Sequence, residues 1–149
     1  DDVRAIAEYL RGLQDPRRMP SLPDPVVLVA PTTDAEKSAA LAAAGGDAEL
    51  AEYIASGTKL FAMTCAACHG KDAKGLPKNG KDLVASEFCK KLNDDELLAY
   101  LKKGRDPSDP LNTTGVGMPP KGGNPALSDD DLLDIISYLR SLQTASSAK

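Results

Sequence analysis

Two cysteines and a histidine lie close together in the run Cys65-Ala66-Ala67-Cys68-His69. Two thiols at this spacing can add across the two vinyl groups of a haem, while the adjacent imidazole reaches the iron from the same side. His69 is the only histidine in the chain. The pattern therefore predicts one covalently attached haem c, bound through Cys65 and Cys68, with His69 as the proximal iron ligand.

Two other chemistries also use closely spaced cysteines. A redox-active dithiol belongs to folds in which strands and helices alternate, and this sequence shows no such alternation. A structural zinc site needs four ligands, usually in spaced pairs, and only Cys89 would remain as a further soft ligand. Adjacent Cys68 and His69 would also have difficulty reaching one tetrahedral ion. The haem interpretation is therefore preferred.

With a single histidine, the sixth iron ligand must come from another type of side chain. Met63 is tied to the proximal side and is expected to fill the core, and Met19 lies in a proline-rich spacer. Met118 lies between a glycine-containing turn and two prolines, which stiffen the chain after the turn. We therefore expect the thioether of Met118 to be the distal ligand.

The elements that would position these residues are helical. Apolar residues at helical spacing predict a helix from residue 47 towards the cysteines, another over 93–104 and a last one over 128–143. An alanine-rich helix is expected over residues 34–44. No convincing alternating strand appears beyond the short run 26–29. The predicted fold class is all-α, with long loops around the haem.

The N-terminal residues repeat the sequence of the last helix. Residues 1–14 and 130–143 share Ile, Tyr-Leu-Arg and Leu-Gln at matching positions, which predicts that 1–14 is the closing helix of a preceding, mostly missing copy. Residues 15–46 then form a proline-rich linker with a short helix, 47–143 the haem domain and 144–149 a disordered tail. The apolar face expected of residues 1–14 needs cover, from the haem domain or from a second molecule in a dimer.

Composition and charge exclude several classes of protein. The longest uncharged apolar run, Val26 to Ala30, is far shorter than the roughly 20 residues of a membrane span. The acidic start lacks the features of a secretory signal, so we expect a mature or excised part of a longer precursor. The formal net charge of −4 argues against general nucleic-acid binding, because nucleic acids are also negatively charged.

Basic residues nevertheless concentrate after the cysteine motif. They are Lys71, Lys74, Lys78, Lys81, Lys90, Lys91, Lys102, Lys103, Arg105 and Lys121. A solvated surface of mixed charge explains them, and a basic rim around the cofactor edge is the alternative. The second interpretation predicts docking to an acidic redox partner.

Residues 47–143 resemble a class I cytochrome c domain of the short bacterial type. The matching residues are Gly57 and Phe61, the run Cys65-Ala66-Ala67-Cys68-His69-Gly70, the run Gly117-Met118-Pro119-Pro120, and Tyr138-Leu139. The resemblance implies a helical fold around the haem, with His69 proximal and Met118 distal. It also implies that the first and last helices cross where Gly57 and Phe61 meet Tyr138.

The same resemblance implies a single-electron carrier and not an enzyme. Its partners would be redox proteins, such as a quinol-oxidising complex and a terminal oxidase, in the periplasm or otherwise outside the cytoplasmic membrane. A fully coordinated iron leaves no position for a substrate, which agrees with electron carriage. The alternatives are a haem enzyme, such as a peroxidase or a sulfur-compound dehydrogenase, and a haem-based sensor with a labile methionine.

Two features depart from the pattern of class I cytochromes. The chain has no Trp that could reach a haem propionate, so other donors must take that role. Cys89 is a third thiol, and we expect it to be buried and inert. An intermolecular disulfide or a redox role for Cys89 is the alternative.

Overall fold

The computed structural model describes residues 28–147, which are predominantly helical. The helices are α2 (Asp34–Ala43), α3 (Ala48–Thr64), α4 (Ala66–His69), α5 (Glu87–Lys91), α6 (Asp94–Lys103), the 3-10 helix η1 (Pro120–Gly123) and α7 (Asp129–Ser147). Strand-like pairing in this part of the chain is limited to one backbone bridge, between Arg105 and Met118. The prediction of an all-α fold is confirmed. The predicted helix over residues 1–14, with any dimer contact through it, lies outside the described residues.

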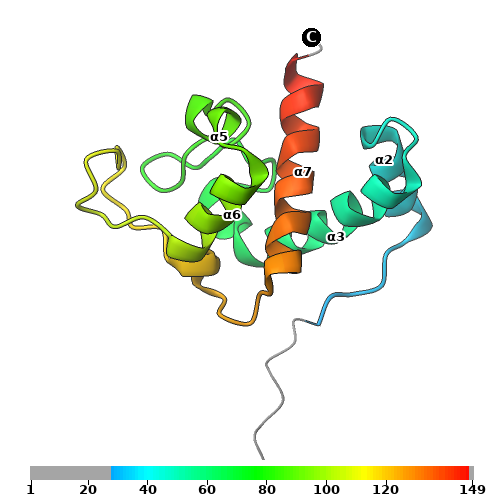
Figure 1. Cartoon of the computed structure of the whole chain (residues 1–149), viewed down its shortest axis with the longest axis horizontal. Coiled ribbons are helices and arrows are strands. Elements are labelled where there is room, and N and C mark those ends of the chain that lie inside the picture. The colour runs from blue at the N-terminus through cyan, green and yellow to red at the C-terminus, as the bar shows by residue number, and fades with distance from the viewer. Residues whose placement is uncertain (1–27, 148–149) are drawn as a thin grey trace, which may run out of the picture.

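Helix α7 crosses α3 at the centre of the molecule, with α5 and α6 on one side of α7 and α2 on the other (Figure 1). A Cβ atom at Gly57 would lie 1.9 Å from the backbone oxygen of Asp134, so only a glycine permits this approach. One turn further along α3, the rings of Phe61 and Tyr138 pack with their centroids 5.4 Å apart. The crossing implied by the family resemblance is therefore present.

Capping residues set where two of these helices begin. The Asn93 side chain accepts a hydrogen bond from the Glu96 amide at 2.9 Å, and the Glu96 carboxylate accepts one from the Asn93 amide at 2.8 Å. Ser128 and Asp131 form the same reciprocal pair at the start of α7. Both caps follow the predicted pattern. Helix α7 continues to Ser147, beyond the expected domain end at residue 143.

Helix α2 packs against α3 and joins it through a turn at Gly45 and Gly46, both with positive φ. A small cluster of buried residues fills the interface between the two helices: Ala40, Ala51, Ile54 and Ala55. The Lys59 ammonium donates to the Ala30 carbonyl at 2.7 Å. The short helix expected over residues 34–44 is therefore present and lies against α3.

Arg140 connects α7 to the region of α5 and α6. Its guanidinium donates to the Cys89 carbonyl at 2.9 Å and to the Leu92 carbonyl at 2.6 Å. It also donates to the Asp94 carboxylate at 3.0 Å. Cys89 itself is buried, as expected, with 6% of its surface exposed.

Among residues 28–147, none of the helices combines the length and hydrophobicity that crossing a membrane requires.

The helix crossing places an acidic side chain in an unfavourable environment. Burial raises the pKa of the Asp134 carboxyl, a nearby Ser56 opposes the rise, and Asp131 and Asp130 add to it. A raised pKa in the folded state means that the protonated form stabilises the fold, and this stability is lost as pH rises through that pKa. We expect Asp134→Asn to raise the urea midpoint slightly at about pH 7 and to have little effect at about pH 3. An equal gain at both pH values would contradict this.

Candidate haem centre

The two cysteines of the motif lie on one helical turn that directly follows α3. The amides of Cys68 and His69 donate to the Cys65 carbonyl at 3.1 and 3.0 Å, which closes that turn. Neither thiol forms a disulfide with another described cysteine. Burial, with a smaller effect from Cys68, raises the pKa of the Cys65 thiol to about 11. Cys65 is half-buried and packs against the hydrophobic core, whereas Cys68 is exposed.

The imidazole of His69 is oriented by a backbone carbonyl. Its Nδ1 atom lies 2.9 Å from the carbonyl oxygen of Lys81. When Nδ1 carries the proton it donates this hydrogen bond, and Nε2 is then the unprotonated nitrogen that can bind a metal. A single contact thus selects both the tautomer and the ring orientation that an iron ligand requires.

The segment that follows the motif wraps closely around it. The Gly75 amide donates to the His69 carbonyl at 2.8 Å. A Cβ atom at Gly80 would lie 2.2 Å from the Cys68 carbonyl oxygen, so this close approach requires glycine. Neither Gly80 nor the Lys81 carbonyl was expected to contribute to the site. The Asn79-Gly80 pair is a turn signal that could have been recognised, but nothing in the sequence indicates which backbone the turn contacts.

Met118 is held at its backbone by Arg105. The Arg105 amide donates to the Met118 carbonyl and the Met118 amide donates to the Arg105 carbonyl, both at 2.8 Å. Gly104, at φ +71°, lies so close that a Cβ atom there would be 2.3 Å from the Met118 carbonyl oxygen. A cavity of about 580 Å³ borders this bridge and is lined by Met118, Arg105 and residues next to them. The side chain of Met118 is half-buried and packs against the main core.

The segment after Met118 returns to the cysteine motif. A Cβ atom at Gly122 would lie 2.9 Å from the Thr64 methyl group and 3.9 Å from the Cys65 sulfur. Cys65 and Met118 also pack against the same core cluster. The structure therefore brings the predicted distal segment next to the predicted attachment site.

The other two methionines do not take part in this arrangement. The expectation that Met63 fills the core is wrong, because 57% of its surface is exposed. On α3 the core face is formed by Leu60 and Phe61, and residue 63 falls on a different side of the helix. Met19 lies outside the described residues.

These residues fit a covalently bound haem. The thiols of Cys65 and Cys68 are both available for thioether bonds, and the hydrogen bond at Nδ1 leaves Nε2 of His69 for the iron. The loop bearing Met118 carries a thioether sulfur, which would be a soft ligand for the iron. Each type of donor that a haem c with His and Met ligands requires is thus present.

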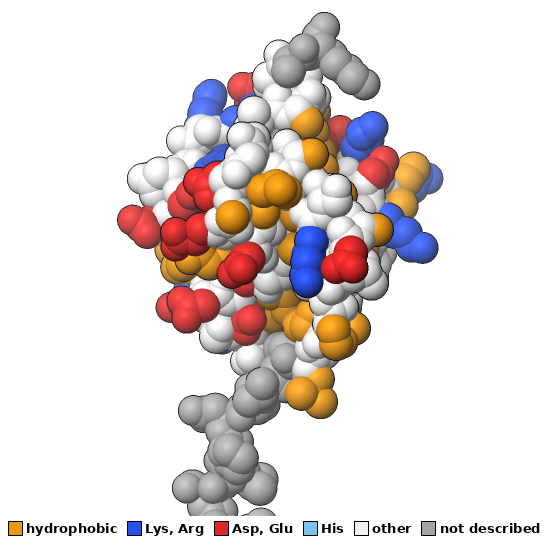
Figure 2. Space-filling view, turned by 90° about the vertical axis from the view of Figure 1, so that its right-hand side faces the viewer, with side chains coloured by type: hydrophobic (Ala, Val, Ile, Leu, Met, Phe, Trp, Pro, Cys, Tyr) orange, Lys and Arg blue, Asp and Glu red, His pale blue; other side chains and the backbone are white. Residues whose placement is uncertain are grey.

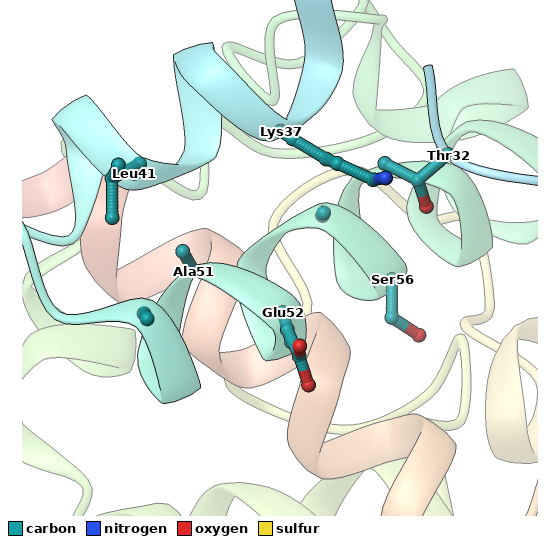
Figure 3. Close-up of a pocket in the computed structure, with 8 residues that line it drawn as sticks. Thr32, Lys37, Leu41, Ala51, Glu52 and Ser56 are labelled. Carbon is teal, nitrogen blue, oxygen red and sulfur yellow. The ribbon is translucent and has the colours of Figure 1, made fainter. Parts of the chain in front are cut away.

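A second cavity, of about 470 Å³, lies between α2 and α3. Figure 3 shows Lys37 extending from α2 towards Thr32, above Ala51, Glu52 and Ser56 of the neighbouring segment. None of the predicted haem residues lines this cavity. On the same side of the molecule, acidic and hydrophobic side chains gather on the surface (Figure 2). The predicted haem residues therefore lie outside this cavity.

Comparisons with known proteins agree with this interpretation. The chain matches the family model described as cytochrome c oxidase, cbb3-type, subunit III over residues 52–139. It is similar to cytochrome c-555 from Prosthecochloris aestuarii, with 28% identity over 93 residues that cover 62% of this chain and 91% of that protein. No solved structure matches the chain. The family match spans all four predicted haem residues, which are Cys65, Cys68, His69 and Met118.

Proposed function

Since this chain belongs to the family of cbb3-type cytochrome c oxidase subunit III, we infer that its covalently bound haem c is attached through Cys65 and Cys68, and that His69 and Met118 would bind its iron. When bound, the haem supplies a one-electron iron couple. The observation that carries this assignment is the contact between His69 Nδ1 and the Lys81 carbonyl, because it leaves Nε2 for the iron. The hydrogen bond also makes the imidazole a stronger electron-pair donor towards a metal.

The remaining residues are suited to electron transfer and not to catalysis. If His69 and Met118 both bind the iron, they would leave no position on it for a substrate. Backbone hydrogen bonds hold the Met118 segment to Arg105, and the Lys81 carbonyl holds His69, so both ligands can stay in place when the charge on the iron changes. The family match likewise points to an electron carrier rather than an enzyme.

We further propose that the chain carries electrons in a respiratory chain, between a quinol-oxidising complex and a terminal oxidase, outside the cytoplasmic membrane. The family description names an oxidase subunit, which supports an oxidase as the electron acceptor. The loop that follows the cysteine motif carries exposed lysines, among them Lys71, Lys74 and Lys78. Such a surface can steer an acidic redox partner to the edge of the haem.

Mass spectrometry of the haem peptide tests the attachment. We expect the peptide that contains Cys65 and Cys68 to carry the mass of one haem through two thioether bonds. Cys65→Ser and Cys68→Ser should each leave at most one thioether, because a serine hydroxyl does not replace the thiol in this addition. Cys89→Ser is the matched control and should keep both bonds. A haem-containing preparation in which the unmutated peptide carries no haem mass would exclude the assignment.

A further inference from the structure

We propose that Arg105 is a positioning residue that holds the distal loop, residues 105–118, closed over the haem. This inference rests on the proposed function, in which Met118 is the distal ligand. The backbone of Arg105 pairs with Met118 through the two hydrogen bonds of 2.8 Å. Arg105 therefore fixes the position of the Met118 backbone where the two ends of the loop meet.

The side chain of Arg105 adds a second attachment in the middle of the loop. Its Nη1 atom donates to the Leu111 carbonyl at 3.2 Å. Asp109 lies 3.9 Å from Nε through its Oδ2 atom, which gives charge attraction without a hydrogen bond. One residue thus contacts both the end and the middle of the distal loop.

The guanidinium also connects the loop to the helical body. Its central carbon lies 4.7 Å from the ring centroid of Phe88 in α5 and 5.0 Å from that of Tyr100 in α6. The two rings pack edge to face, 5.1 Å apart. A cation over aromatic faces is stabilised electrostatically, more strongly when it is shielded from water. The Arg105 side chain is well shielded, with 16% of its surface exposed.

The loop itself is folded as a unit. The Asn112 side chain donates to the carbonyls of Asp106 and Val116, at 3.2 and 2.8 Å. Its oxygen accepts hydrogen bonds from the amides of Thr114 and Gly115, both at 3.0 Å. Because the loop is internally bonded, its attachment to the helices governs how often it opens. Arg105 supplies that attachment to α5 and α6.

The geometry requires an arginine and not merely a positive charge. The Nε atom of Arg105 is buried and has no hydrogen-bond partner among the described residues. The stacking of the guanidinium on the aromatic rings therefore holds the side chain more than hydrogen bonds do. A lysine cannot stack on two rings and donate to the Leu111 carbonyl in the same way. Arg105→Lys should therefore loosen the loop although the charge is retained.

The binding of imidazole to the oxidised, haem-bound protein measures how often the loop opens. Imidazole takes the distal position only when Met118 has left it, so its apparent affinity rises in proportion to the open fraction. We expect Arg105→Met to raise this affinity about 10-fold or more, and Arg105→Lys to raise it by a smaller factor. In the oxidised protein, a bond between methionine sulfur and haem iron gives a weak absorption band in the red. This band should weaken in the same order.

Arg140→Met is the matched control. Arg140 is a partly buried arginine that donates to the Cys89 carbonyl in α5 and to the Leu92 carbonyl just after it, and none of its hydrogen bonds with described residues reaches the distal loop. A general loss of stability would raise imidazole affinity equally in the Arg140 and Arg105 variants, and that result would overturn the proposal. So would an unchanged affinity in both Arg105 variants.

Hydrogen exchange separates this proposal from the assignment of Met118. In the haem-bound protein, peptides covering residues 106–118 should exchange faster in Arg105→Met than in Arg140→Met. If the unmutated protein lacks the methionine band, ligation by Met118 is wrong, yet the exchange rates still decide the role of Arg105. Equal exchange in the two variants would refute that role.

Discussion

Replacing Met118 by alanine is expected to leave the haem covalently attached and to lower its reduction potential by on the order of 100 mV or more. The thioether sulfur favours ferrous iron, and its removal leaves water or another harder ligand at the distal position. The thioether bonds at Cys65 and Cys68 do not depend on this ligand. The weak red band of the oxidised protein should disappear together with the fall in potential.

Potentiometric titration followed by visible absorption measures both effects in one sample. Met63→Ala is the control, because Met63 is exposed on α3 and contributes no ligand in the proposed arrangement. It should leave both the band and the potential unchanged. If Met118→Ala behaves like Met63→Ala, the distal ligand is a different group. If Met63→Ala abolishes the band, the assignment of the two methionines is reversed.

Gly57→Val is expected to destabilise the fold by roughly 3 kcal/mol or more. The first carbon of any side chain would overlap the Asp134 carbonyl oxygen, which a Cβ atom would approach to 1.9 Å. The obstructing atoms are backbone, so they cannot move aside by a change of rotamer. The two central helices would have to separate, which would also disturb the contact between Phe61 and Tyr138.

Urea denaturation of the haem-bound protein provides the measurement. Ala62→Val is the control, since Ala62 lies on the same helix but is exposed. This control should cost only the small helix-propensity difference between alanine and valine, about 0.5 kcal/mol. Similar losses in the two variants would show that the close crossing does not limit the stability of the fold.

The attachment motif, the helices and their caps could be predicted because their signals are local. The capping pair Asn93 and Glu96 is separated by three residues, and the geometry of one helical turn determines its contact. The family resemblance allowed Gly57 to be assigned to a helix crossing, because it implies that this residue meets the last helix. Such features need no knowledge of how distant parts of the chain meet.

Other features of the site depend on distant contacts or on backbone atoms. The Lys81 carbonyl that orients His69 is present in every residue type, so no side-chain signal marks it. Arg105 was included among the surface charges, whereas the fold places its guanidinium over Phe88 and Tyr100. The exposure of Met63 depends on the rotation of α3, where a shift of one residue turns a side chain by about 100°.

The contact between Gly122 and Cys65 has a consequence for the biogenesis of the protein. In the folded chain the segment after Met118 lies beside the Cys65 sulfur, and a Cβ atom at Gly122 would be 3.9 Å from it. An enzyme that joins haem to this sulfur needs room for the macrocycle and for its own active site. If haem is joined to this sulfur, as we propose, we expect the joining to precede the closing of the C-terminal segment beside it.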